Sequence, residues 1–425
     1  MKRIQLLTLA ATALLANGAS AHNSISENIG LETATALADS TKTDSIEGFR
    51  FTTVDSVAIT SVKNQKNAGT CWSYSGLSFL ESEILRKTGK VYDFSEMFVV
   101  ENTYMDRADK AVRTHGDVSF SQGGSFADVF YCLSNYGLVP DAEMPAGAMY
   151  GDTLSNHKEL SAMTDPLVKA AASATKLQFS PDGEALWKKA VRAVHEIYLG
   201  KLPEKFTYEG KQYTPLTFAA STGLSADDYV SLTSFTHHPY STGKNLGKGF
   251  IIEVQDNWRW AESVNLELDD MMRIIDEALA NGYSVLWGGD VSEDGFTRDG
   301  LAVWPDLTAP DAPGQDQARW LKLDRKAKGE ELTKRPLPQK EVTAESRQRG
   351  YDNFETGDDH GMHIFGTAKD QTGNRYYMVK NSWGKTGKYK GIWYMTPEFC
   401  RAKTMNFVVN KNAIPKDLRK KYGIK

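Results

Sequence analysis

The sequence has little cysteine for its length, with three residues, Cys71, Cys132 and Cys400, in a chain of 425. One disulfide would leave an odd thiol, and so few bridges cannot hold a chain of this size together, so stability must come from a hydrophobic core. Cys132 lies in an apolar helical run and is predicted to belong to the core, and Cys400 is predicted to be structural. Cys71 alone has a setting typical of a reactive thiol.

The sequence also lacks a strong charge and a long hydrophobic run in its body. The formal net charge is −4, and no run of Lys and Arg is interleaved with aromatic residues, so no nucleic-acid partner is expected. After the first residues no apolar stretch is long enough to cross a bilayer, so no membrane span is expected. The aromatic residues, 18 Tyr, 18 Phe and 9 Trp, suit a folded enzyme or binding protein and argue against disorder.

The beginning of the chain has the pattern of an export signal. Met1-Lys2-Arg3 is a charged start, Ile4 to Ala16 is a short apolar stretch, and Ala19-Ser20-Ala21 fits the small residues of a cleavage site. We therefore expect residues 1–21 to be a signal peptide cleaved near Ala21, and the protein to be periplasmic or extracellular. Residues 22–47 are polar and are predicted to form an extension before the fold.

Helix patterns fill the first third of the chain and strand patterns fill the last hundred residues, which predicts the α+β class. Apolar residues at helical spacing follow Cys71, Ser95 is placed to cap a second helix, and a third is expected from Phe126 to Tyr136. Strands are expected at 50–63, 284–287, 363–369, 375–381, 391–396 and 405–409, with Gly373-Asn374 as a hairpin turn. Residues 305–345 are predicted to be a long surface excursion.

Cys71 follows Gly69-Thr70 and opens a predicted helix. The unpaired N–H groups and the positive end of a helix dipole favour a thiolate there, so we expect the thiol pKa to be lowered. Gln65 precedes the cysteine in a loop from which its side-chain amide can reach a developing oxyanion. By itself the pattern fits a buried structural cysteine equally well.

A nucleophilic thiol needs a base, and the base needs a group that orients it. His360 stands at the start of a predicted strand, and Asn381 ends the next one. A hairpin between these strands would place the amide of Asn381 beside the ring of His360, with Trp383 covering the hydrogen bond. Taken separately, His360 could equally cap a strand and Asn381 could equally make a turn.

Two other kinds of site fit the sequence less well. Asp359, His360 and His363 are part of a metal-ligand set, but no further closely spaced ligands accompany them. His237-His238 is better explained as part of a loop. No Gly-x-Ser-x-Gly motif supports a serine hydrolase. We therefore expect no metal and no other cofactor.

The motifs together resemble the papain-like cysteine peptidases, and within them the bleomycin hydrolase/aminopeptidase C branch. The resemblance rests on Gln65 with Gly69-Thr70-Cys71-Trp72, on His360-Gly361-Met362 and on Lys380-Asn381-Ser382-Trp383-Gly384, and it covers residues 48–418. It implies two lobes, a helical lobe mainly at 65–140 and an antiparallel, barrel-like β lobe mainly at 346–410. Large insertions are implied at 141–345, and residues 411–425 form the tail.

The resemblance also implies a role for each site residue. Cys71 would be the nucleophile, His360 the general base and then the acid, and Asn381 the residue that orients His360. The amide of Gln65 and the backbone N–H of Cys71 would form the oxyanion hole. His363 is the fallback base, and Asp358 and Asp359 lie near enough to tune the site. The substrates implied are peptides.

The branch further implies a homohexamer whose C-terminal arm restricts the enzymes to aminopeptidase action. The tail of this sequence, from Ile414 to Lys425, is shorter than that arm and lacks its apolar, proline-containing end. Three interpretations therefore stay open at this point. They are an aminopeptidase, an endopeptidase with the same catalytic residues, and a binding protein that keeps the fold without catalysis.

Overall fold

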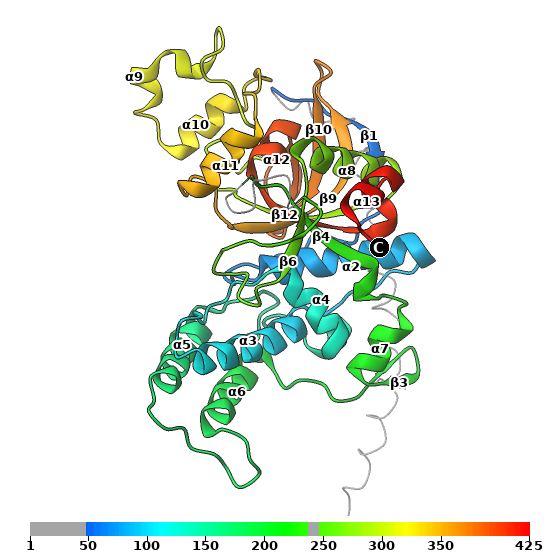
Figure 1. Cartoon of the computed structure of the whole chain (residues 1–425), viewed down its shortest axis with the longest axis vertical. Helices are drawn as coiled ribbons and strands as arrows, with labels where there is room; N and C mark the ends of the chain where they lie inside the picture. Colours follow the sequence, from blue (N-terminus) through cyan, green and yellow to red (C-terminus); the bar gives the residue numbers. More distant parts are fainter. Residues whose placement is uncertain (1–47, 237–245) are drawn as a thin grey trace, which may run out of the picture.

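The computed structural model describes residues 48–236 and 246–425 (Figure 1). The predicted signal peptide at 1–21, the polar extension at 22–47 and the loop at His237-His238 lie outside these ranges. In the described part of the chain, no helix is long and apolar enough to cross a membrane.

Helices form the first lobe, as the sequence predicts. The side chain of Ser95 accepts a hydrogen bond from the backbone N–H of Phe98 at 3.1 Å and so caps the second helix. Gly89 ends the first helix with φ of 71°, a conformation that glycine adopts without strain. The helices of this half are α2 (Cys71–Thr88), α3 (Glu96–Arg113), α4 (Phe126–Asn135), α5 (Lys158–Ala172), α6 (Leu186–Leu199) and α7 (Pro215–Ser221).

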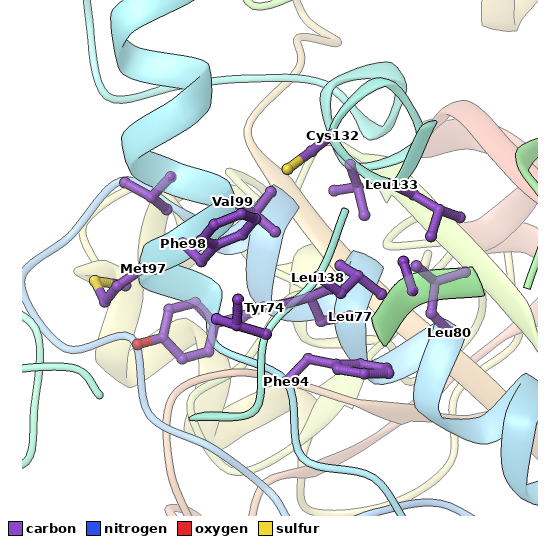
Figure 2. Close-up of a cluster of buried hydrophobic side chains, with 14 of the residues drawn as sticks. Tyr74, Leu77, Leu80, Phe94, Met97, Phe98, Val99, Cys132, Leu133 and Leu138 are labelled. Carbon is purple, nitrogen blue, oxygen red and sulfur yellow. The ribbon is translucent and has the colours of Figure 1, made fainter. Parts of the chain in front are cut away.

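A cluster of buried apolar side chains joins α2, α3 and α4 (Figure 2). Leu77 and Leu80 of α2 are fully buried in it, and Cys132 of α4 lies in the same cluster. Cys132 is therefore the core residue that the sequence predicts. Because α2 packs into this cluster along its length, the position of Cys71 at its first turn is fixed by the core and not by a loop.

A ten-stranded sheet forms the second lobe, in the order β5-β6-β4-β12-β7-β9-β10-β11-β8, with β1 paired to β9. Its strands are β1 (Thr52–Ser56), β4 (Tyr229–Thr233), β5 (Gly249–Ile251), β6 (Glu262–Asn265), β7 (Val285–Gly289), β8 (Leu301–Ala302), β9 (His360–Lys369), β10 (Arg375–Lys380), β11 (Ile392–Met395) and β12 (Thr404–Asn410). The other elements are a small hairpin of β2 (Phe206–Tyr208) and β3 (Lys211–Tyr213), and the helices α8 (Leu268–Ala280), α9 (Gln317–Trp320), α10 (Arg325–Leu332), α11 (Ala344–Asp352), α12 (Pro397–Lys403) and α13 (Lys416–Tyr422).

The sheet is larger than the β lobe predicted at 346–410. That region supplies β9 to β12, whereas β4 to β8 come from the predicted insertions at 141–345 and β1 comes from the start of the fold. Most of these strands are short, so alternation of polar and apolar residues does not reveal them. The strand expected at 50–63 is confined to β1, and 305–345 carries the short helices α9 and α10 on the surface excursion (Figure 1).

Strands β9 and β10 form the predicted antiparallel hairpin, with the turn at Gly373, whose φ is 89°. Near its open end His363 pairs with Lys380, the last residue of β10. The hairpin thereby brings the first residue of β9, His360, to the same edge of the sheet as Asn381.

The sheet has α2 on one face and α8 on the other. Along β7, Leu286 packs in the cluster that contains α2, whereas its neighbours Val285 and Trp287 pack in the cluster that contains α8. Successive side chains of a strand point to opposite faces, so the two clusters lie on opposite sides. The tail helix α13 belongs to the α8 side, because Leu418 packs in the second cluster.

We expect Leu286→Ala to lower the free energy of unfolding by about 2–5 kcal/mol, the range for a buried leucine whose removal leaves a cavity. Leu286 is fully buried, whereas Leu321 is 78% exposed. The same substitution at Leu321 should therefore change stability by less than about 0.5 kcal/mol. Urea unfolding of both variants checks this, and equal effects at the two positions would show that β7 is not packed against α2 as described.

Candidate active site

Cys71 is the first residue of α2, and the loop before it is held by hydrogen bonds. The backbone N–H of Gly69 donates to Oε1 of Gln122 at 2.8 Å, and the indole N–H of Trp72 donates to the carbonyl oxygen of Gln122 at 3.1 Å. Gly124 lies against the same indole, so close that a Cβ there would be 2.7 Å from the ring. These contacts fix the direction in which the Cys71 side chain leaves the helix.

The ring of His360 is hydrogen-bonded to Asn381 and covered by Trp383. Its Nε2 lies 2.7 Å from Oδ1 of Asn381, and the ring centroids of His360 and Trp383 are 4.8 Å apart. Because Oδ1 can only accept, Nε2 carries the hydrogen, and in the neutral ring Nδ1 is then the atom free to take a proton. The pairing expected from the hairpin is thus present.

Gln65 is buried, and both ends of its side-chain amide are bonded. Its Nε2 donates to the carbonyl oxygen of Ala68 at 2.7 Å, and its Oε1 accepts from the hydroxyl of Ser382 at 2.6 Å. The backbone N–H of Gln65 also donates to the carbonyl oxygen of Ser382 at 2.8 Å. Nε2 has a second hydrogen, so the amide keeps a donor while its orientation is set by Ser382.

The packing of α2 on β9 brings the two halves of the site together. The backbone N–H of Gly361, the residue after His360, hydrogen-bonds the sulfur of Cys71. A Cβ on Gly361 would lie only 2.7 Å from the hydroxyl of Ser75 in α2, so glycine is what allows this close approach. Cys71, His360, Asn381 and Gln65 are therefore assembled at one place from both lobes.

The protonation states differ from the expectation for a helix N-terminus. Burial raises the pKa of the Cys71 thiol to about 12, and the negative charges of Asp358 and Asp256 act in the same direction. Hydrogen bonds from the N–H groups of Gly361 and Trp72 oppose this but do not overcome it. Burial lowers the pKa of His360 to about 4, although the hydrogen bond to Asn381 acts to raise it. Taken separately, each shift favours the neutral form of its group, a thiol at Cys71 and an imidazole at His360.

His363, the fallback base, lies elsewhere. It is fully buried, its Nδ1 is 2.9 Å from the hydroxyl of Ser78 in α2, and burial holds its pKa well below the usual value. Asp359 is instead hydrogen-bonded to Asp290. Asp359, His360 and His363 thus have separate partners and do not form the metal-ligand set considered from the sequence, and no group of potential ligands is found in the described residues.

Two contributions to the site could not be anticipated from the sequence. Ser382 holds the amide of Gln65, yet a serine after an asparagine at a strand end carries no distinctive signal. The carboxylates of Asp256 and Asp358 both act on Cys71. Asp358 is near His360 in the sequence, but nothing in the sequence connects Asp256 with either residue.

The profile of the Peptidase C1-like family matches residues 17–308 and 344–425. The chain belongs to the Peptidase C1-like family. Its relatives include aminopeptidase G of Lactobacillus delbrueckii subsp. lactis, 25% identical, with 84% of this chain and 82% of the relative covered. The mitochondrial cysteine proteinase 1 of Saccharomyces cerevisiae is 24% identical over 91% of this chain and 82% of its own length.

A solved structure of the same fold agrees with this assignment. The crystal structure of pepw from Lactobacillus rhamnosis matches with a TM-score of 0.63 and 19% identity, covering 96% of this chain and 93% of the other. The prediction of a papain-like α+β fold in this peptidase family is therefore confirmed.

Replacing Asn381 with alanine tests how the histidine is held. The hydrogen bond to Asn381 raises the pKa of His360, so its loss should lower that pKa further below about 4. Because His360 accepts a proton only above its pKa, the acid limb of the kcat/KM profile should move to lower pH. The rate at neutral pH should fall at least about tenfold, since the ring loses its orientation. Asn412→Ala, at an exposed position, is the control, and an acid limb that moves upward would contradict this account.

Proposed function

We propose that this protein is a cysteine peptidase in which Cys71 is the nucleophile and His360 the general base. The observation that carries the proposal is the hydrogen bond of 2.7 Å from His360 to Asn381, beside a cysteine at a helix N-terminus. It leaves Nδ1 as the proton acceptor of a histidine whose neighbour in the sequence, Gly361, hydrogen-bonds the Cys71 sulfur. Gln65, held by Ser382, and the backbone N–H of Cys71 supply donors for an oxyanion.

The reaction follows from these positions. As the sulfur of Cys71 attacks the carbonyl carbon of the peptide bond, its proton passes to Nδ1 of His360, so the predicted thiolate–imidazolium pair forms during attack. The imidazolium gives that proton to the leaving nitrogen, the C–N bond breaks, and an acyl-enzyme remains. Water then attacks the thioester, its proton passes to Nδ1, and the proton returns to the sulfur as the acid is released.

We propose aminopeptidase action on peptides as the first candidate, supported by the name of aminopeptidase G and of other relatives in the family. Endopeptidase action is the second candidate, and the position of the tail favours it. Tyr422 donates to Asp270 of α8, and Lys421 and Asp417 form ion pairs with α8 or the residue before it. Because α2 lies on the opposite face of the sheet, helix α13 is held away from the side on which α2 packs.

Export and assembly are also part of the proposal. The charged and apolar start of the sequence with Ala19-Ser20-Ala21 supports cleavage near Ala21 and a periplasmic or extracellular location. The resemblance to bleomycin hydrolase and aminopeptidase C supports a homohexamer. Mass spectrometry of the secreted product and light scattering of the purified protein test these two points.

Cys71→Ala should lower hydrolysis of a peptidyl coumarin amide by about a thousandfold or more, because the acyl-enzyme cannot form. Cys132→Ala, which removes a buried thiol in the α4 core, is the matched control and should keep most of the activity. Survival of activity in Cys71→Ala would support the interpretation as a non-catalytic binding protein contaminated by another peptidase.

A peptide with an acetylated amino terminus separates the two candidate specificities. An aminopeptidase should leave it intact while trimming the free form residue by residue, whereas an endopeptidase should cut both internally. Mass spectrometry of the products decides, with Cys71→Ala as the blank for each peptide. Internal fragments from the acetylated peptide would exclude strict aminopeptidase action.

A further inference from the structure

A cavity of about 190 Å³ has sequence neighbours of site residues in its wall. Ser125 in its wall directly follows Gly124, which packs on Trp72, and Asp358 in its wall comes two residues before His360. Its volume is several times the ~30 Å³ that one water molecule occupies. The cavity is thus placed to take a group of the substrate while the peptide bond lies at Cys71.

The walls of this cavity combine apolar surface with hydrogen-bond acceptors. Phe130, Met405 and Val408 supply the apolar part, and Ser231, Asn406 and Asp358 supply polar atoms. Such a lining suits a short aliphatic stem that ends in a polar group. Asp358 brings a carboxylate to the wall of the cavity, so the complementary polar group is a cation.

Asp358 has no cation among the described residues. It forms no hydrogen bond or ion pair with them, whereas nearby Asp256 is paired with Arg107 at 3.1 Å. Arg107 is fully buried and also holds the carbonyl oxygen of Gly123 at 2.7 Å, so it is not available to Asp358. Burial and the neighbouring Asp256 and Asp359 raise the pKa of Asp358 to about 7, as expected for a carboxyl that lacks a positive partner.

We infer that Asp358 binds an ammonium group of the peptide substrate in this cavity and thereby sets substrate preference. The inference rests on the proposed peptidase function. Two sources share this chemistry, the free amino terminus of the peptide and the side chain of a lysine before the scissile bond. Helix α13 does not fill this place, since Leu418 and Tyr422 pack on the α8 side of the sheet.

Four coumarin amides distinguish the two possible origins of the ammonium group, the amino terminus and a lysine side chain. They are alanyl-alanyl, N-acetyl-alanyl-alanyl, N-acetyl-lysyl-alanyl and N-acetyl-norleucyl-alanyl, each assayed with the full-length protein and with Asp358→Asn. Loss of a charge-assisted hydrogen bond corresponds to about a 10- to 100-fold fall in kcat/KM. Asp55→Asn, at an exposed position on β1, is the control for loss of one negative charge.

A fall confined to the free alanyl-alanyl amide assigns Asp358 to the amino terminus, and a fall confined to the lysyl amide assigns it to the side chain. Both outcomes support the inference. An equal effect of Asp358→Asn on all four substrates, or no effect on any, would overturn it.

Binding provides a second readout that does not depend on turnover. In Cys71→Ala, calorimetry with trialanine, its N-acetylated form and N-acetyl-lysyl-alanyl-alanine should show that Asp358→Asn raises Kd about 10- to 100-fold for the cationic peptide that Asp358 recognises. If the wild-type protein cleaves no substrate, the proposed function fails, yet these affinities still decide the role of Asp358. Equal Kd values with and without the substitution would refute it.

Discussion

The pairing of β9 with β10 is the constraint on which the site depends. It holds His360 and Asn381 at one edge of the sheet, and the fit of Gly361 against Ser75 presses that edge onto the first turns of α2. Ser382 then ties the same edge to the loop of Gln65. The candidate catalytic residues are therefore positioned by a hairpin, a core helix and one serine hydroxyl. Buried packing supports each of these elements, so the site does not depend on loops alone.

Burial and the helix N-terminus oppose each other at Cys71, and burial has the larger effect. The sequence shows the helix start and the adjacent backbone donors, which stabilise a thiolate, but it does not show how far the surrounding residues bury Cys71. Nor does it show that Asp256 and Asp358 approach the thiol. A pKa raised to about 12 instead of lowered is the result, and it shifts formation of the ion pair from the resting protein to the moment of attack.

The features that the sequence predicted correctly were local structures or were carried by motifs. The cap at Ser95, the helix end at Gly89 and the hairpin between His360 and Asn381 follow from spacing, and the motifs led to the correct family. Strand β7 matches the one expected at 284–287, whereas β6 and β8 escaped notice because they are short and gain their stability from neighbours distant in the sequence. The contact of Ser382 with Gln65 could not be predicted for the same reason. A hydrogen bond between residues 317 positions apart produces no periodic pattern in the sequence.

The raised pKa of Cys71 also bears on how this thiol reacts with oxidants. Oxidants attack the thiolate and not the thiol. Because burial and the charge of Asp358 both raise the pKa of Cys71, little thiolate is present for an oxidant to attack. If Asp358 binds a substrate cation as inferred above, that cation offsets its negative charge and lowers the pKa of Cys71. The thiolate then becomes more accessible when a peptide is bound than when the site is empty.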